Sequence, residues 1–180
     1  MRRVEYFLSG ALDSSVLADF YKMLRRAELN SDDEFHLFIQ SEGGSVGVGL
    51  SIAKMVMGAG CKTVTYNVSN VDSAAVTIFA AGDIRIASPC SVFYVHAIGR
   101  ELYGVKTAEE LRAIITEIDA DTARIAEYLS SRTRLSVNDW RDLMTSPCVL
   151  TAEKGYEIGL VSSVSEFSVY HSATWIGSAR

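Results

Sequence analysis

The spacing of apolar residues switches repeatedly between strand-like and helix-like periods along this chain of 180 residues. The β-rich run "VEYFLSG" ends at Gly10, and Asp13 or Ser14 can then cap a helix whose apolar residues recur at intervals of three and four from Val16 onward. The strand-like run "FHLFIQS" follows, and a second helical pattern comes after it. This alternation predicts an α/β fold with partly parallel strands joined by right-handed crossovers.

The alternation continues through the rest of the chain. A glycine-rich turn leads into a helix in "EGGSVGVGLSIAKMVMGAG", "KTVTYNV" is a predicted strand, and "SAAVTIFAAG" is a predicted helix that is apolar nearly all round and therefore buried. "IRIA" and "SVFYVHAIG" are further predicted strands, and residues 107–131 form one long amphipathic helix. Shorter helices are expected to begin at Ser136 and Thr151, and the last segment is expected to be irregular.

Composition and charge narrow the classes of function. A hydrophobic content of 48% without a linker-like stretch predicts one domain over residues 1–165, with a C-terminal tail over 166–180. Seventeen basic and 22 acidic residues give a net charge of −5 without a long basic cluster, so we expect no nucleic-acid partner. No apolar run reaches about 18 residues and no signal peptide precedes the first strand, so we expect a cytoplasmic protein without membrane contact.

The three cysteines indicate neither a disulfide framework nor a metal site. Cys61, Cys90 and Cys148 lie far apart and show no spacing typical of metal ligands. We expect buried thiols in a reducing compartment, with no metal and no cofactor.

Two strand-to-helix turns carry residues that could do chemistry. In "QSEGGSVG", the pair Gly43 and Gly44 could present bare backbone N–H groups to an oxyanion, although a tight turn that needs positive φ explains the same pair. In "SNVDSAAV", Ser73 stands at the start of the buried helix, either as an N-cap or as a nucleophile. In α/β folds, sites gather at such turns beyond the carboxyl ends of strands.

A nucleophilic serine needs a base within hydrogen-bond reach, and the chain has three histidines. His36 lies within an alternating strand, where a half-exposed position would explain it, and His171 lies in the tail. His96 ends the strand "SVFYVH" and is followed by "AIG", so it too stands at a strand's carboxyl end. Together with the glycine turn, this makes His96 the candidate base.

At this combination the sequence resembles the Clp protease proteolytic subunit, the ClpP-like serine peptidases of the crotonase-like superfold. The likeness extends from about Phe7 to Val164 and rests on the order of five pieces: "FLSGALD", "SEGGSV", "SAAVTIFAAG", "SPCSVFYVHAIG" and "TAEKGYEIGLVSSV". The resemblance implies a repeated β-β-α spiral. It also implies a serine endopeptidase with Ser73 as nucleophile, His96 as general base and then acid, and an oxyanion hole formed by the backbone N–H groups of Gly44 and Ala74.

The resemblance also implies the surroundings of such a subunit. The helix over 107–131 would match the family's handle, through which two rings of subunits stack face to face. The implied substrate is a peptide or an unfolded protein, and the implied partners are further copies of the chain and an AAA+ unfoldase. No cofactor is implied.

Four positions depart from the family pattern, and one of them is Ser69, which stands where the family usually has the glycine of its serine signature. Glu42 stands where the family has proline, Asp72 replaces a small residue before the serine, and Pro147 stands where the aspartate that orients the histidine belongs. Proline cannot accept a hydrogen bond from the imidazole. Asp142 in the preceding helix is a possible third residue, and Asp139 is another.

Further alternatives remain open at this point. A backbone carbonyl near Thr145 or Ser146 could orient the histidine instead of a carboxylate. The chain could also be a catalytically weak or inactive structural or regulatory subunit of the same kind of ring, as Pro147 suggests. A crotonase-type enzyme that acts on an acyl-CoA is the third alternative, although a serine at the start of the second buried helix has no required role there.

Overall fold

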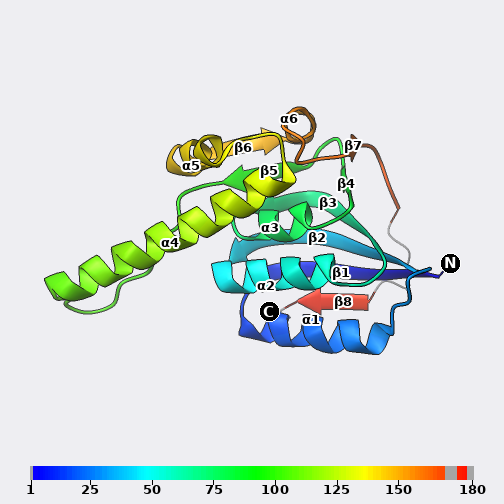
Figure 1. The fold of residues 1–180 in the computed structure, drawn as a ribbon, viewed down its shortest axis with the longest axis horizontal. Helices are drawn as coiled ribbons and strands as arrows, with labels where there is room; N and C mark the ends of the chain where they lie inside the picture. Colours follow the sequence, from blue (N-terminus) through cyan, green and yellow to red (C-terminus); the bar gives the residue numbers. More distant parts are fainter. Residues whose placement is uncertain (1, 169–173, 178–180) are drawn as a thin grey trace.

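The fold is built on one eight-stranded sheet with helices packed against it (Figure 1). The computed structural model of the chain describes residues 2–168 and 174–177. In chain order the elements are β1 (Arg3–Leu12), α1 (Ser14–Ala27), β2 (Glu34–Gly44), α2 (Val46–Met57), β3 (Lys62–Asp72), α3 (Ala75–Ala80), β4 (Ile84–Ala87), β5 (Val92–Val95), α4 (Ala108–Arg132), α5 (Val137–Thr145), β6 (Cys148–Thr151), α6 (Ala152–Glu157), β7 (Ser163–Val164) and β8 (Thr174–Gly177).

Most strands of the sheet are parallel. The main order is β6-β5-β3-β2-β1-β8, and among the described strands only β5 and β6 pair in the antiparallel sense. One edge of β3 is shared, because its first half pairs with β4 and its last residues, from Asn70 to Asp72, pair with β5. This arrangement confirms the predicted α/β fold with partly parallel strands.

The hydrophobic core lies between the sheet and helices α1, α2, α3 and the C-terminal half of α4. Phe20 of α1, Ile52 of α2 and Phe79 of α3 are all fully buried in this core. All six residues of α3 are buried. The short apolar helix is therefore enclosed as the sequence predicts, and it fixes the turn that precedes it.

Polar side chains set several helix starts where the sequence predicts them. Asp13 caps α1, since its carboxylate accepts from the backbone N–H groups of Ser15 and Val16 at 2.8 and 3.0 Å. Ser136 and Thr151 cap α5 and α6 in the same manner. Each cap satisfies backbone donors that the first helical turn leaves without intrahelical partners.

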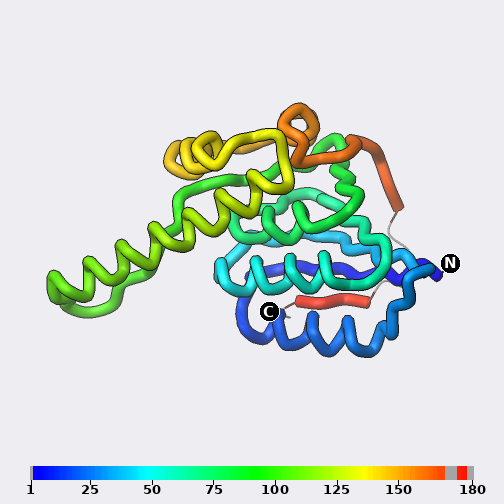
Figure 2. Tube along the Cα trace, in the orientation of Figure 1, coloured from blue at the N-terminus to red at the C-terminus, as the bar shows by residue number. Residues whose placement is uncertain are grey.

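Strand β1 and the C-terminal tail differ from the prediction. β1 does not end at Gly10, which has a φ of 81°, but shifts register there and continues to Leu12. Part of the tail is not irregular, because Thr174–Gly177 forms β8 parallel to β1 (Figure 2). The Trp175 ring stacks on Phe7 with centroids 5.1 Å apart. The predicted tail histidine, His171, lies outside the described residues.

The predictions of a half-exposed His36 and of a buried Cys90 were also wrong. His36 is buried rather than half-exposed, because the second face of the sheet is covered around it; its Nδ1 lies 2.9 Å from the Tyr66 hydroxyl. Phe167, beyond the last residue of the predicted domain, packs on that same face against Phe38 and Tyr66. Cys90 is exposed on a turn, whereas Cys61 and Cys148 are partly buried.

Helix α4 projects from the body and returns into it (Figure 1). Its first half leaves Leu111 and Ile115 exposed, whereas Ile125 and Leu129 in its second half are buried in the core. The connection before α4 runs alongside the helix, where Arg100 forms an ion pair of 2.8 Å with Asp121. In the part of the chain that the structure describes, no helix combines the length and the apolarity that crossing a membrane requires.

Candidate active site

Ser73 occupies the turn between β3 and α3 in a left-handed backbone conformation. Its φ is 54°, and among the described non-glycine residues only Glu28 shares a positive value. Such a conformation is strained for a residue with a side chain and is frequent at functional sites. The Ser73 N–H donates to the Tyr94 carbonyl at 2.8 Å, and the Ser73 carbonyl accepts from Val76 N–H at 3.1 Å. These bonds hold the strained turn in place.

The hydroxyl of Ser73 does not cap helix α3. The N-cap residue is Ala74, and no side chain makes a cap hydrogen bond at this helix start. Within the described residues, the Ser73 Oγ makes no hydrogen bond at all. The N-cap interpretation of Ser73 is therefore wrong, and its half-buried hydroxyl is left for another role.

The glycine turn of β2 lies directly against the serine turn of β3. Gly43 has a φ of 84°, and a Cβ placed on it would lie 2.6 Å from the Asp72 carbonyl oxygen and 2.7 Å from the Ser73 Cβ. No side chain fits in that space. Gly49 of α2 packs equally closely, since a Cβ there would lie 2.7 Å from the Ala74 carbonyl oxygen. The two turns that the sequence singles out therefore form one site.

His96 reaches the same edge of the sheet one residue after β5 ends. Its Nδ1 lies 2.7 Å from the carbonyl oxygen of Ala97, and its ring stacks on Tyr94 with centroids 5.1 Å apart. A carbonyl oxygen can only accept, so Nδ1 carries the proton of a neutral ring and Nε2 keeps its lone pair. Within the described residues no hydrogen bond joins His96 to Ser73. Catalytic hydrogen bonds are often long without substrate.

The family model for Clp protease matches residues 1–168 of this chain. The chain belongs to the Clp protease family. The ATP-dependent Clp protease proteolytic subunit 2 of Pseudomonas aeruginosa is 26% identical over 163 residues, which cover 88% of this chain and 79% of that protein. The protein of the same name from Treponema denticola is 22% identical over 165 residues, which cover 90% of this chain and 82% of that protein.

A solved structure shares the fold of this Clp protease family member. A mutant of ClpP1 from Listeria monocytogenes superposes with a TM-score of 0.77 at 21% sequence identity, and the match covers 92% of each chain. The predicted ClpP-like α/β fold and the resemblance of the sequence to the ClpP-like peptidases are both confirmed.

This Clp protease family member has no carboxylate next to His96 on strand β6. Strands β5 and β6 pair in the antiparallel sense, with Val95 opposite Cys148. Because antiparallel partners run in opposite directions, one step beyond this pair brings Pro147 opposite His96. The alignment of the sequence with the family pattern and the register of the strands therefore point to the same departure.

Asp142 lies on α5, and its carboxylate does not contact His96. The side chain is exposed and makes no hydrogen bond within the described residues. It borders a hollow between α5 and α6 together with Asp139 and Lys154. Asp139 is engaged in the cap of α5, where it accepts from Ser136 N–H at 2.8 Å. The structure thus brings Ser73 and His96 to one edge of the sheet and leaves Asp142 apart from them.

Asp72 is the carboxylate that approaches the site. Its Oδ1 accepts from the backbone N–H of Tyr94 at 3.1 Å. Burial raises the pKa of Asp72 above its ordinary value, the Tyr94 N–H and the charge of His96 lower that pKa, and the charge of Glu42 raises it further. Glu42 itself is exposed.

Two residues of the site were missed at the sequence level. Tyr94 stacks on His96, and the signal for it was their spacing of two along a strand, which places both side chains on one face. The Ala97 carbonyl gave no sequence signal, because every residue has a backbone carbonyl.

Groups of three or more His, Cys, Asp or Glu that could hold a metal ion do not occur among residues 2–168 and 174–177.

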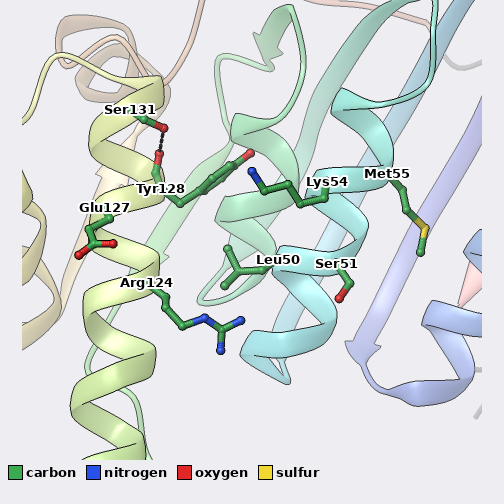
Figure 3. Close-up of a pocket in the computed structure, with 8 residues that line it drawn as sticks. All are labelled: Leu50, Ser51, Lys54, Met55, Arg124, Glu127, Tyr128 and Ser131. Carbon is green, nitrogen blue, oxygen red and sulfur yellow. Dashed lines mark hydrogen bonds between the residues drawn. The ribbon is translucent and has the colours of Figure 1, made fainter.

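A separate groove lies between α2 and α4 (Figure 3). The Lys54 ammonium lies 5.9 Å from the centroid of the Tyr128 ring, and burial raises the pKa of Tyr128 to about 12. The groove is lined by Leu50, Ser51, Lys54, Met55, Arg124, Glu127, Tyr128 and Ser131. It contains neither Ser73 nor His96, so it is separate from the candidate active site.

Proposed function

We propose that this chain is an active serine endopeptidase subunit, with Ser73 as nucleophile and His96 as general base. The observation that carries the proposal is the strained turn at Ser73, whose φ of 54° coincides with an uncapped hydroxyl and with close packing against the Gly43 turn. A helix cap would explain none of these three features. The family of the chain favours the same chemistry, because its relatives are named as protease subunits.

The proposed reaction follows the roles of a serine and a histidine in acyl transfer. The His96 Nε2 takes the proton of the Ser73 hydroxyl as Oγ attacks the carbonyl carbon of the substrate. The protonated imidazole then gives this proton to the leaving amine as the peptide bond breaks. Water, activated by the same ring nitrogen, releases the acyl group from Ser73 and restores the hydroxyl.

The oxyanion of the tetrahedral intermediate would be held by the backbone N–H groups of Gly44 and Ala74. The proposal is supported by the close approach of the two turns, since a Cβ at Gly43 would lie 3.1 Å from the Ala74 nitrogen. Backbone donors in a fixed arrangement stabilise developing negative charge without reorganising during the reaction.

A second candidate function is a weak or inactive subunit of the same kind of assembly. It is favoured by Pro147, which lies one residue before β6, opposite His96 by extension of the β5–β6 register, and carries no carboxylate. In a serine-protease triad, neutralising the aspartate lowers kcat about 10⁴-fold, so slow hydrolysis is expected unless another group replaces it. The alternative of an acyl-CoA enzyme is not carried further, because the chain belongs to the Clp protease family.

We further propose that the chain assembles into stacked rings that degrade peptides or unfolded proteins. The projecting half of α4 supports this, because it leaves Leu111 and Ile115 exposed. Apolar side chains on a projecting helix indicate a surface that a partner covers. The two named relatives are called ATP-dependent, which favours an ATPase such as an AAA+ unfoldase as partner. A cytoplasmic location remains a prediction.

Labelling with a fluorophosphonate probe tests the function directly. The probe forms a covalent bond with an activated serine, and peptide mass spectrometry identifies which serine reacted. We expect labelling at Ser73 that depends on pH and is lost in His96→Ala. Equal labelling in wild type and His96→Ala, or no labelling at Ser73, would contradict the active-peptidase proposal and favour the inactive subunit.

A further inference from the structure

The C-terminal end of helix α3 is enclosed by the protein, so its carbonyl groups need hydrogen-bond donors from other segments. The last carbonyl groups of an α-helix have no partner within the helix. All six residues of α3 are buried, as are Ala81 and Gly82 after it. The Thr65 hydroxyl donates to the Phe79 carbonyl at 2.7 Å. The carbonyl groups that follow Phe79 must find their donors elsewhere.

Arg132, the last residue of α4, donates to three of these carbonyl groups. The end of α4 that returns into the body lies beside α3 (Figure 1). The Arg132 Nε donates to the Ala80 oxygen at 2.9 Å, and Nη2 donates to the oxygens of Ala81 and Gly82 at 3.3 and 2.9 Å. A positive charge at a helix C-terminus is stabilising, and the planar guanidinium can bond several acceptors at once in a fixed geometry. The end of α3 is therefore attached to α4.

Arg85 of β4 brings a second guanidinium to the same place. Its Nη1 donates to the Gly82 carbonyl at 3.1 Å, and its other nitrogens donate to Gly159 and Leu160 at 3.1 and 2.8 Å. Burial and the nearby charge of Arg132 lower the pKa of Arg85. In the part of the chain that the structure describes, neither arginine forms an ion pair with a carboxylate. Backbone carbonyl groups are thus what both cations bind.

These hydrogen bonds supply a restraint that the side chains of α3 do not. Its one polar side chain, Thr77, bonds within the same helical segment, to the Ala74 carbonyl at 2.7 Å. Apolar burial is not directional, whereas a hydrogen bond fixes both distance and angle. At the start of the segment, the Ser73 N–H donates to the Tyr94 carbonyl at 2.8 Å. The axial position of α3 is therefore fixed by hydrogen bonds at its two ends, with Arg132 at the far one.

We infer that Arg132 is a positioning residue for Ser73, which acts through helix α3 and not by contact with the substrate. The helix has six residues and spans only about 9 Å, so a shift at its end reaches the serine turn. Misplacing a reacting group by about 1 Å can cost roughly 100-fold in rate. The inference rests on the proposed function, since it names a residue that holds the proposed nucleophile in place.

Amide hydrogen exchange of the full chain, resolved to single residues by mass spectrometry, measures this hold without relying on catalysis. Arg132→Met removes every donor and keeps a side chain of similar length. We expect it to speed exchange of the Ala81 N–H and of the Ser73 N–H at least about tenfold, because local opening of α3 exposes both amides. Unchanged exchange at Ser73 would overturn the inference.

Arg134→Met is a matched control. The Arg134 Nη1 donates to the carbonyl groups of Tyr156 and Glu157 at 3.4 and 2.9 Å, at the C-terminal end of α6, which also has six residues. The control thus removes a guanidinium from a helix end of the same length, two residues further along the chain. Exchange of the Ser73 N–H should stay within about twofold of wild type. Equal acceleration in the two variants would overturn the inference.

Two measurements of activity distinguish positioning from a purely structural role. Arg132→Met should lower the rate of fluorophosphonate labelling at Ser73 and the kcat for a fluorogenic peptide at least about tenfold, with KM changed less than about twofold. Each rate is divided by the folded fraction, measured by near-ultraviolet circular dichroism. Arg134→Met should stay near wild type. Faster exchange at Ser73 without slower labelling would show that Arg132 only supports the fold.

Arg132→Lys keeps the measurement possible if Arg132→Met does not fold. Lysine retains the charge and can donate to part of the carbonyl group set, so its labelling rate should lie below that of wild type and above that of Arg132→Met. A rate equal to that of wild type would overturn the role of the guanidinium. If the Ser73 N–H exchanges faster in the variants but wild type is not labelled, the hold on the serine turn stands and the proposed function fails. If wild type is labelled and neither variant changes exchange or labelling, the function stands and the inference fails.

Discussion

A Cβ placed on Gly43 would lie 2.7 Å from the Cβ of Ser73, so the glycine turn of β2 and the serine turn of β3 fit together only because one of them lacks a side chain. This contact joins two segments that are 30 residues apart and have no local reason to meet. Both residues also have positive φ values, of 84° at Gly43 and 54° at Ser73.

The first prediction concerns this contact. Gly43→Ala should destabilise the fold by about 2 to 4 kcal/mol and abolish labelling of Ser73, because the new methyl group meets backbone atoms that cannot move away independently. Gly60→Ala is a matched control, since Gly60 also has a positive φ, of 74°, but nothing lies within 4 Å of its added Cβ. It should lose only about 1 kcal/mol. Urea unfolding measures both losses of stability. Similar losses in the two variants would show that the packing of Gly43 against Ser73 does not exclude a side chain.

The second prediction separates strain from function at Ser73. Ser73→Ala and Ser73→Gly should both abolish peptide hydrolysis, because each removes the nucleophilic oxygen. Ser73→Gly should be more stable than Ser73→Ala by about 1 kcal/mol, since glycine adopts a positive φ without strain. Thermal unfolding of the two variants tests this, and peptide hydrolysis by either one would show that Ser73 is not the nucleophile.

The third prediction concerns the position opposite His96. Pro147→Asp should raise the rate of peptide hydrolysis at least about tenfold, because a carboxylate there can pair with the imidazole. Pro147→Asn controls for the removal of proline and should give a smaller increase. No increase in either variant would favour the inactive subunit.

Asp142→Asn completes this test. Since the Asp142 side chain is exposed and makes no hydrogen bond to His96, we expect the rate to stay within twofold of wild type. A larger fall would show that α5 moves and brings this carboxylate to the imidazole during the reaction.

The fourth prediction concerns assembly. Ile115→Glu should convert a large homo-oligomer into a smaller one, because it places a charge on the apolar face of the projecting part of α4, where Ile115 is 57% exposed. Tyr156→Ser changes a side chain that is 52% exposed on α6 and should leave the mass unchanged. Light scattering coupled to gel filtration measures both. A monomeric wild-type protein would contradict the proposed rings.

The fifth prediction follows from the raised pKa of Asp72, of which burial is the main cause. A carboxyl whose pKa is higher in the folded state favours folding when protonated, and this contribution disappears as the pH rises through the folded-state pKa. Asp72→Asn should therefore be more stable than wild type at neutral pH, with the difference shrinking below about pH 4. Urea unfolding at several pH values measures this difference in stability between Asp72→Asn and wild type. A variant that is less stable than wild type at pH 7 would contradict the prediction.

Local sequence determined the order of elements and the two turns that carry the candidate chemistry. The helix starts at Asp13, Ser136 and Thr151 depend on side chains that accept hydrogen bonds from backbone N–H groups within three residues. The local sequence therefore predicts these helix starts. The burial of α3 followed from its uniformly apolar composition. Ser73, His96 and the glycine pair were found because strand ends are where such residues gather in α/β folds.

Tertiary structure alone decided which of these residues lie close together. The pairing of Thr174–Gly177 with β1 and the burial of His36 depend on strands distant in sequence, so neither left a local pattern. The pairing of Asp72 with Tyr94, and of Cys148 with Val95, depends on strand register, and a one-residue shift would turn each side chain to the other face. Register is set by the packing of the whole sheet, and for that reason the sequence predicted Ser73 and His96 as candidates but not the contacts of the His96 ring with Tyr94 and Ala97.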